Sequence, residues 1–538
     1  MSSDNREDSE RDTQQALITA LARAEAFPHR VEEIRLIETH ISWVMLTGDY
    51  AYKIKKCVNF GFLDFSTLAR RRHFCEEEIR LNGRLAPDLY LAVVPITGPA
   101  AQACIGGSGE PLEYAVKMRQ FDLRDTFDAL LARHALAAAQ MEETAQVLAR
   151  FHATIAPADA GAPFGSPAAI LQPALENFDQ LGESLAAGQT PHRLGDKLIS
   201  LRQWTTEQHT ALIPTFVARK QAGRIRECHG DLHLRNIVLW EGRVTPFDGI
   251  EFNDNLRWID VINELAFLLM DLDDHQQPAL SRQLLNSYLS LSGDYDGLRV
   301  LRFYQIYRAM VRAKVAGLRL VQIEAPNAAA QQLQEIDNYL QLAEDYTRVK
   351  QPALIITHGL SGSGKTYLAS RLAHATGLIH LRSDVERKRC FGLAPLAKTQ
   401  SAPEAGIYTS QATQDTYQHL LQLARTILSA HYSVLVDATF LQRPQRDAFR
   451  ALAEELGLPF TILHCEASDE TLQQRVRHRQ QMERDASEAD LQVLENQQQK
   501  QQPLAADERA YTRVVQTAEA TQTPDAMHRL VADLKLGV

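Results

Sequence analysis

The sequence lacks the features of membrane-spanning and disulfide-bonded proteins. It contains no uninterrupted apolar run of about 18 residues, so it predicts no transmembrane helix and no membrane partner. The six cysteines are spread over the whole chain without a Cys-x-x-Cys pair or a metal-ligand spacing, which favours buried free thiols. The first residues show no signal-peptide pattern. We therefore expect a cytoplasmic protein.

The sequence also lacks an excess of basic residues. The net charge is −10, of which −9 lies before residue 352 and −1 after it. Proteins that bind many nucleic-acid phosphates carry clustered Lys and Arg. The charge balance therefore favours small-molecule substrates over nucleic acid, although a short 5′ end could still enter one pocket. The sequence carries no signal for an oligomeric state.

The length and the local composition predict two domains. A chain of 538 residues is too long for one hydrophobic core, and its length allows roughly two to four domains. Residues 1–15 are almost free of apolar residues and are predicted to be disordered. A predicted helix at 328–347 is followed by a short polar segment. We therefore place a first domain at 16–347, a linker at 348–352 and a second domain at 353–538.

A phosphate-binding loop is predicted at the start of the second domain. GLSGSGKT at 359–366 fits the pattern G-x-x-x-x-G-K-[ST] and lies between a predicted strand and a predicted helix. Glycines allow backbone N–H groups to converge on phosphate oxygens, while the lysine supplies charge and the hydroxyl can hold Mg²⁺. The candidate ATP-binding residues are Gly359, Ser361, Gly362, Ser363, Gly364, Lys365 and Thr366, the last also a metal ligand. A plain glycine-rich turn is the alternative.

Alternating strands and helices follow this loop and predict a parallel sheet with crossover helices, an α/β fold. Strands are expected at 353–358, 378–382, 433–437 and 459–465, with left-handed helix ends at Gly377 and Gly457. Asp437 ends a strand, from which a carboxylate can reach the Mg²⁺ shell. A helix-capping role is its alternative.

With GLSGSGKT, LRSDVERKR, SVLVDATF and RVRHRQQMERDASEAD, the second domain resembles P-loop kinases of the polynucleotide kinase, gluconate kinase and zeta-toxin type. The resemblance implies that Asp384 accepts the proton of a substrate hydroxyl and that Arg387 contacts the substrate. Arg475 and Arg479, four residues apart on one helical face, are then lid arginines over the transferring phosphate. A helix cap at Asp384 and a solvated basic face are the alternatives.

The first domain begins with a predicted strand hairpin at 32–55 and a helix around 68–85. Lys53 and Lys55 lie on one face of the strand by period-two alternation, and one of them is the candidate phosphate ligand. One of Glu76, Glu77 and Glu78 could pair with it, and Glu78 is favoured because Leu81 and Leu85 follow at helical spacing. A solvated face of three glutamates is the alternative.

A second phosphoryl-transfer motif lies about 130 residues before the phosphate-binding loop. HGDLHLRN at 229–236 has the Asp-x₄-Asn spacing of a kinase catalytic loop. Together with LARFHA and FDGIEFN, it resembles aminoglycoside and choline phosphotransferases, which have a bilobal α+β protein-kinase-like fold. The resemblance implies that Asp231 is the catalytic base, that Asn236 and Asp248 are Mg²⁺ ligands, and that Asp260 is structural. His229 is expected to stabilise the loop.

One departure from kinase patterns is clear, because only Gly48 precedes Lys53 where a full G-x-G-x-x-G would lie. The two motifs together predict a bifunctional ATP-dependent kinase that uses Mg²⁺, with each domain phosphorylating a hydroxyl of a small-molecule acceptor. One alternative is a P-loop head regulated by a nucleotide-sensing or protein-modifying first domain. Another is a P-loop head acting on nucleic-acid 5′-hydroxyls. The sequence names neither acceptor.

Overall fold

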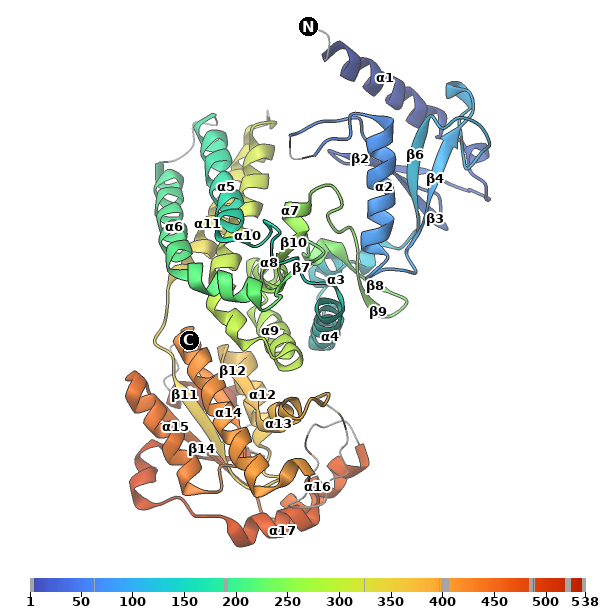
Figure 1. Cartoon of the computed structure of the whole chain (residues 1–538). Coiled ribbons are helices and arrows are strands. Elements are labelled where there is room, and N and C mark those ends of the chain that lie inside the picture. The colour runs from blue at the N-terminus through green and yellow to red at the C-terminus, as the bar shows by residue number, and fades with distance from the viewer. Residues whose placement is uncertain are drawn as a thin grey trace. The chain divides into compact units, whose positions relative to one another are not determined.

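The computed structural model, shown in Figure 1, describes residues 4–61, 63–187, 192–323, 325–395, 397, 406–482, 487, 489–517 and 524–534. The chain forms two compact units. The first comprises Met1–Gln140, Arg150–Glu176 and Ile213–Asp271, and the second comprises Met141–Ala149, Asn177–Leu212 and Leu272–Val538.

A six-stranded antiparallel sheet dominates the N-terminal part of the first unit. Its order is β1-β2-β3-β6-β4-β5, and helix α2 packs on β4 and β6. The predicted hairpin at 32–55 is in fact three strands, because a turn at Gly48 (φ +96°) adds β3 to β1 and β2. The elements are β1 (Arg35–Glu38), β2 (Ser42–Leu46), β3 (Tyr50–Lys55), α2 (Leu68–Asn82), β4 (Tyr90–Thr97), β5 (Cys104–Ile105) and β6 (Glu113–Arg119).

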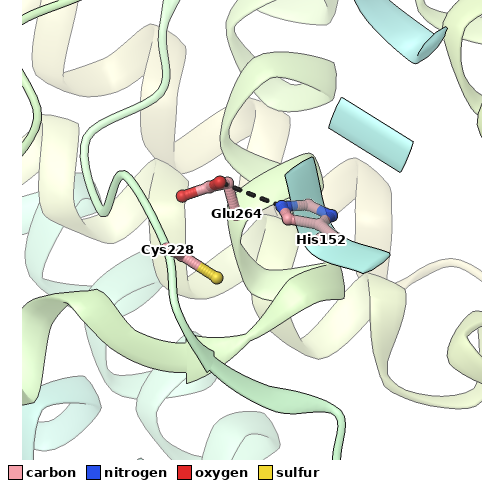
Figure 2. A group of neighbouring side chains, drawn as sticks. All are labelled: His152, Cys228 and Glu264. Atoms are coloured by element: carbon pink, nitrogen blue, oxygen red, sulfur yellow. Dashed lines mark hydrogen bonds and ion pairs between the residues drawn. The ribbon is translucent and has the colours of Figure 1, made fainter. Parts of the chain in front are cut away.

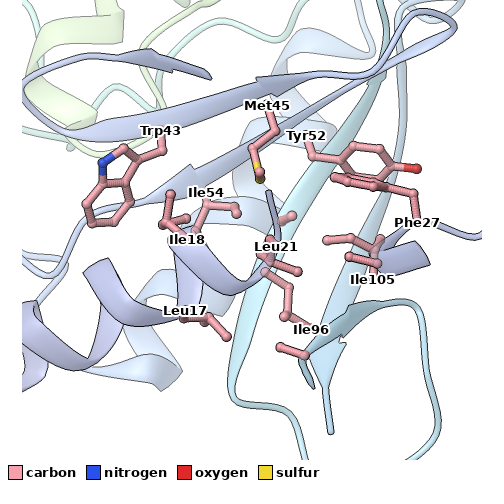
Figure 3. Close-up of a cluster of buried hydrophobic side chains, with 13 residues drawn as sticks. Leu17, Ile18, Leu21, Phe27, Trp43, Met45, Tyr52, Ile54, Ile96 and Ile105 are labelled. Carbon is pink, nitrogen blue, oxygen red and sulfur yellow. The ribbon is translucent and has the colours of Figure 1, made fainter. Parts of the chain in front are cut away.

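The prediction of a disordered segment at 1–15 is wrong for the residues that the structure describes. Helix α1 runs from Asp4 to Ala20. Leu17 and Ile18 of this helix, and Leu21 directly after it, are buried against apolar side chains of the sheet (Figure 3). The Gln14 amide donates to the Lys55 carbonyl at 2.9 Å and to the Glu113 carboxylate at 2.7 Å. Tertiary contacts at the end of the helix thus order a segment that its composition alone predicts to be disordered.

The rest of the first unit carries the motif at 229–236. A two-stranded hairpin, β8–β9, follows the motif, β7 pairs with β10, and the strongly apolar helix α8 is buried. Helices α4 and α8 continue into the second unit. The elements are α3 (Phe127–Ala132), α4 (Ala138–Thr154), β7 (Ile225–Glu227), β8 (Ile237–Trp240), β9 (Arg243–Pro246), α7 (Asp254–Arg257), β10 (Trp258–Asp260) and α8 (Val261–Asp274).

The second unit combines long helices with a five-stranded parallel sheet. Two of the helices, α5 and α6, begin or end in the first unit. In α10, 14 of the 23 residues are buried, and α10 packs along α11. The helices that precede the sheet are α5 (Pro167–Ala187), α6 (His192–Gln221), α9 (Pro278–Ser292), α10 (Leu298–Leu320) and α11 (Pro326–Thr347). The unit thus begins before the predicted linker, so the sequence-based domain boundary stays a prediction.

The parallel sheet has the order β12-β13-β11-β14-β15, and its strands are joined by crossover helices. The predicted α/β fold is confirmed, with left-handed helix ends at Gly377 (φ +81°) and Gly457 (φ +65°). The strands are β11 (Leu354–His358), β12 (Ile379–Arg382), β13 (Val434–Asp437), β14 (Phe460–Glu466) and β15 (Thr512–Gln516), which the sequence did not predict. The helices are α12 (Lys365–Thr376), α13 (Ser383–Cys390), α14 (Ser410–Ser429), α15 (Arg443–Leu456), α16 (Asp469–Met482), α17 (Leu491–Lys500) and α19 (Pro524–Asp533).

All six cysteines are free thiols. The prediction that they are buried holds for four of them and is wrong for Cys104, which is half-buried, and Cys390, which is exposed. Within the described ranges, the structure contains no helix that is both long and apolar enough to cross a lipid bilayer.

Candidate active sites

Two lysines of β3 share one buried glutamate in the first unit. Lys53 Nζ lies 2.9 Å from Glu78 Oε1, and Lys55 Nζ lies 2.6 Å from Glu78 Oε2. The period-two alternation therefore placed both lysines correctly on one face. Lys55 is fully buried and also pairs with Glu251, whereas Lys53 reaches Asp248 Oδ1 at 2.6 Å. Lys53 is thus the lysine that extends toward the predicted metal-binding residues.

Of the three candidate glutamates, the rotation of α2 buries only Glu78. Glu76 pairs with Arg72 on the exposed face, and Glu77 pairs with Arg80. Burial by itself raises the pKa of Glu78, but the ammonium groups of Lys53 and Lys55 outweigh it and lower that pKa to about 2. Glu78 is therefore a charged anchor that holds both lysines in place.

The predicted catalytic loop is folded as a compact turn before β8. Asn236 Nδ2 donates to the Asp231 carbonyl at 3.0 Å and to Asp231 Oδ2 at 3.2 Å. Because the side-chain nitrogen of Asn236 faces Asp231, its side-chain oxygen, Oδ1, is the atom that could bind a metal ion. His233 Nε2 lies 3.4 Å from Asp231 Oδ2. Asp231 and Asn236 thus lie together, as the Asp-x₄-Asn spacing predicts.

Asp248 follows β9 in an unusual backbone conformation. Its φ is +62°, a left-handed value that costs energy for a residue other than glycine. Its N–H donates to Tyr90 Oη at 3.0 Å, and the adjacent Phe247 carbonyl contacts His229 Nε2 at 2.8 Å. Burial lowers the pKa of His229. His229 therefore connects the catalytic loop to the Asp248 segment, in agreement with the stabilising role expected for it.

A buried network beneath the catalytic loop was not predicted. Glu264 in α8 accepts a hydrogen bond from the Gly230 N–H at 2.8 Å, and its other oxygen lies 3.0 Å from His152 Nε2 (Figure 2). Burial raises the pKa of Glu264, but the His152 hydrogen bond and charge keep it below its ordinary value. The Cys228 thiol lies beside this pair and is fully buried. Glu264 thereby fixes the backbone one residue before Asp231.

Asp260 has a different partner. Its carboxylate accepts two hydrogen bonds from the buried Arg219 guanidinium, at 2.6 and 2.8 Å, and one from the Ile262 N–H at 2.9 Å. It therefore tethers α6 to the start of α8. The carboxylates that contact the catalytic loop come from α8: Glu264 accepts a hydrogen bond from the Gly230 N–H, and Asp271 accepts one from the Leu234 N–H at 2.9 Å.

In the second unit, the phosphate-binding loop joins β11 to α12 and requires glycine at several positions. Gly362 and Gly364 both have φ +87°, and an added Cβ would lie 2.8 Å from the Leu472 carbonyl oxygen and 2.8 Å from Thr517 Oγ1, respectively. Lys365 Nζ donates to the carbonyls of Gly359 and Leu360 at 2.9 and 2.8 Å. Burial lowers the pKa of Lys365.

Nearly all of the residues predicted for the second site line one cavity of about 490 Å³. Members from the loop are Ser361, Gly362, Gly364, Lys365 and Thr366, and members from elsewhere are Asp384, Arg387, Asp437, Arg475 and Arg479. Gly359 and Ser363 belong to the loop but do not line the cavity. The fold thus brings together predicted residues from four separate segments of the chain.

The arginines of the cavity are held by specific partners. Arg387 is buried, and its guanidinium donates to the Ile407 carbonyl at 2.9 Å and lies over the Tyr408 ring. Arg475 Nη1 lies 3.3 Å from the Gly362 carbonyl oxygen of the loop, and Arg479 donates to the Ala489 carbonyl at 2.9 Å. Arg475 therefore contacts the phosphate-binding loop directly, whereas Arg387 faces the same cavity from α13.

The two carboxylates of the cavity have different surroundings. Asp384 lies in the first turn of α13, whose N-cap residue, Arg382, makes no capping hydrogen bond through its side chain. Asp437 is buried, and its Oδ2 lies 3.2 Å from His380 Nε2. Burial raises the pKa of Asp437, but His380, Arg382 and Lys365 together hold it below its ordinary value. Asp437 is thus a charged, oriented carboxylate at the end of β13.

Several residues around this cavity were missed by sequence reasoning. His380 orients Asp437, Gln497 Oε1 accepts a hydrogen bond from the Ser361 N–H at 2.9 Å, and Tyr417 Oη accepts one from the Phe440 N–H at 3.1 Å. Arg382 is paired in register with Asp437, and His380 lies two residues earlier on the same strand. Strand alternation could therefore have predicted that His380 lies on the same face as Asp437. The position of Gln497 depends on how α17 packs, which the sequence does not show.

The donor sets of both sites suit a magnesium nucleotide. Carboxylate, amide and hydroxyl oxygens are the ligands that Mg²⁺ prefers, and Asn236, Asp248, Thr366 and Asp437 supply them. Glycine at 362 and 364 lets the loop pack closely against Leu472 and Thr517. The loop leads directly into α12, and the start of a helix favours bound phosphate. The residues present therefore fit ATP with Mg²⁺.

The chain is similar to other proteins in sequence and to several solved structures. A curated relative, an uncharacterized protein of Mycobacterium tuberculosis (strain ATCC 25618 / H37Rv), is 29% identical over 445 residues, which cover 82% of this chain and 85% of the relative. A solved choline/ethanolamine kinase family protein from Mesorhizobium loti is 12% identical and covers 62% of this chain and 99% of its own (TM-score 0.35). A putative kinase from Chloroflexus aurantiacus is 21% identical and covers 34% and 98% (TM-score 0.28).

Two family descriptions match the chain in succession. Residues 65–304 match the phosphotransferase enzyme family, and residues 354–504 match an AAA domain family. The first match contains Glu78, the predicted catalytic loop and Asp248, whereas Lys53 and Lys55 lie before its first residue. The second match contains the phosphate-binding loop and Asp384. The chain therefore joins a kinase-like region of the phosphotransferase enzyme family to a P-loop kinase region with a parallel α/β sheet.

Proposed function

We propose that the protein is a bifunctional ATP-dependent phosphotransferase in which each site transfers the γ-phosphoryl group of ATP to a hydroxyl of a small-molecule acceptor. The observation that carries this proposal is the convergence of Lys365, Asp384, Arg387 and Asp437 on one cavity. The match of both regions to kinase-type families supports it. Such reactions need positioning and charge stabilisation more than covalent chemistry.

At the first site, Lys53 would bind nucleotide phosphates while Glu78 holds its ammonium group in place. Asn236 and Asp248 would hold Mg²⁺, which neutralises charge on the phosphates when it is bound. Asp231 would accept the proton of the acceptor hydroxyl, and the Glu264 hydrogen bond to Gly230 keeps the backbone of that loop in position.

At the second site, Lys365 and the backbone of the phosphate-binding loop would hold the β and γ phosphates. Thr366 and Asp437 would hold Mg²⁺ from the loop and from the end of β13. Asp384 would accept the hydroxyl proton of the acceptor, and Arg387 would bind the acceptor. Arg475 and Arg479 would cover the transferring phosphate, where positive charge stabilises the transition state.

Transfer of radiolabelled γ-phosphate tests this proposal. The full chain is incubated with [γ-³²P]ATP, Mg²⁺ and a pooled panel of metabolites and oligonucleotides, alongside Asp231→Asn and Asp384→Asn variants. Each variant is expected to lose a different set of labelled products by at least about 10²-fold, the usual contribution of a general base. Products that survive in one variant also serve as the control for correct folding of the other site.

Other outcomes distinguish the alternatives. Labelled oligonucleotides that disappear in Asp384→Asn would assign a nucleic-acid 5′-hydroxyl to the second site. Release of free phosphate alone from all three proteins would contradict the two-kinase proposal and favour a regulated ATPase.

A further inference from the structure

The edge of the parallel sheet is completed by a helix that precedes it in the chain. Strand β12 is the end strand of the sheet, and such a strand normally leaves backbone groups unpaired. Asn286 in α9 accepts a hydrogen bond from the His380 N–H at 2.7 Å and donates to the Leu378 carbonyl at 3.2 Å. Its side-chain amide therefore pairs with this edge as a neighbouring strand would.

Two arginines hold the helix ends next to that edge. Arg282 in α9 donates to the carbonyls of His374 and Ala375, at 3.2 and 2.6 Å, in the last turn of α12. Arg302 in α10 donates to the carbonyls of Ala430 and His431 after α14, at 3.0 and 2.8 Å. The last carbonyls of a helix lack intrahelical donors, so these arginines supply hydrogen bonds that the sheet domain does not provide for itself.

Helix α13 is attached to the same segment through a buried carboxylate. Glu386 is completely buried, and its Oε1 accepts a hydrogen bond from Tyr295 Oη at 3.2 Å. Arg389 Nε donates to Glu386 Oε2 at 3.0 Å, and the same guanidinium donates to the Ser290 carbonyl at 2.5 Å. Gly293 packs closely on this guanidinium, because an added Cβ would lie 2.7 Å from Arg389 Nη1.

Glu386 lies next to the residues of α13 that line the cavity, so its contacts affect their position. It lies two residues after Asp384 and one before Arg387 in a helix of only eight residues. A short helix has little stability of its own, so its orientation depends on such tertiary contacts. Moving Glu386 would therefore move both side chains that face the cavity.

We propose that α9 and the following turn at Tyr295–Gly297 position the acceptor-side helix α13 of the P-loop site, with Tyr295 and Arg389 as positioning residues. Asn286, Ser290 and Tyr295 all lie inside the region that matches the phosphotransferase family, 65–304. They nevertheless belong to the same compact unit as the parallel sheet. The P-loop site is thus built partly from the preceding region, and the roles of Asp384 and Arg387 in this argument rest on the proposed function.

Hydrogen exchange in the full-length chain tests this positioning. Tyr295→Phe removes only the hydroxyl that contacts Glu386, and Arg389→Gln removes the link to Ser290. The matched control is Tyr346→Phe, which removes a hydroxyl that donates to the Asp273 carboxylate of α8 at 2.6 Å in the same unit. Exchange is followed in the 383–390 amides, and binding of a fluorescent ADP with Mg²⁺ is measured in parallel.

Both test variants are expected to speed exchange at 383–390 by about tenfold, the effect of losing a hydrogen bond to a charged group. Tyr346→Phe should leave these amides at the wild-type rate. The dissociation constant for the fluorescent ADP should stay within about twofold in Tyr295→Phe, because the phosphate-binding loop is untouched. An unchanged rate at 383–390, or an equal rise in the control, overturns the proposal.

The proposed ATP-dependent function and the positioning of α13 by α9 can fail separately. If the fluorescent ADP does not bind to the wild-type chain, the proposed ATP-dependent function fails. The comparison of exchange rates without nucleotide still decides whether α9 positions α13.

Discussion

At the scale of single residues, the two lysines of β3 have separable tasks. Lys53 bridges Glu78 and Asp248, and its side chain keeps some exposure to solvent at 13%. Lys55 is 1% exposed and lies between Glu78 and Glu251. The first is placed to meet a nucleotide, whereas the second neutralises two carboxylates in the interior.

Replacing each lysine by methionine should therefore have different effects. Lys55→Met is expected to lower stability by about 3–5 kcal/mol, because it leaves the buried Glu251 without its lysine and Glu78 with Lys53 alone. Lys53→Met should cost less stability but reduce ATP-dependent turnover at the first site by about 10²-fold or more. Thermal melting and phosphate transfer measure the two effects. Equal losses of stability in both variants would contradict this division of roles.

At the scale of elements, the register of β11 against β14 creates a pair of histidines beneath the phosphate-binding loop. His358 lies opposite His464, and their Nδ1 atoms are 2.8 Å apart. Burial and the neighbouring His464 charge lower the pKa of His358 from 6.5 to about 3. His358 is therefore neutral in the folded chain at pH values where the unfolded chain binds a proton.

This pair predicts a pH dependence of stability. The unfolded state binds more protons than the folded state between about pH 6.5 and 3, so the contribution of His358 is intact above pH 6.5 and is lost as the pH falls through that window. From pH 7.5 to 5.5 the loss amounts to about 1 kcal/mol. In His358→Gln the urea midpoint should fall less over this range than in wild type. A parallel fall in both proteins would contradict the prediction.

Helix α1 gives a second prediction at this scale. Leu21, the residue directly after α1, is completely buried against the first sheet, so Leu21→Ala should lower the stability of the first unit by about 2–5 kcal/mol. Gln15→Ala, at an exposed position of α1, is the control and should change stability by less than about 0.5 kcal/mol. Thermal melting compares them. Equal melting temperatures for Leu21→Ala and wild type would show that α1 does not stabilise the sheet.

At the scale of the whole molecule, the proposed function places one nucleotide site in each of the two regions. Calorimetric titration with a non-hydrolysable ATP analogue and Mg²⁺ should give a stoichiometry near two per chain. Lys365→Ala and Lys53→Ala should each reduce it to near one, because each removes the positive charge from one phosphate site. A wild-type stoichiometry near one would show that one of the two sites does not bind ATP.

Much of both sites was predictable because the decisive residues are close in sequence. The phosphate-binding loop is a contiguous strand–loop–helix segment, and the spacing of Asp231 and Asn236 fits within one turn. Strand alternation likewise put Lys53 and Lys55 on one face. The sequence favoured Glu78 over Glu76 and Glu77 but left the other two open. The rotation of α2 against the sheet decides which glutamate is buried.

The sequence by itself determined the two motifs, the parallel fold of the second region and the glycines that its loop requires, since these depend on local backbone geometry. Tertiary structure alone decided that Glu264 supports the catalytic loop, that His380 orients Asp437, and that Asn286 closes the edge of β12. These contacts join segments 34 to 94 residues apart. Helix α1 was mispredicted for the same reason: its order comes from packing on a distant sheet, which composition does not encode.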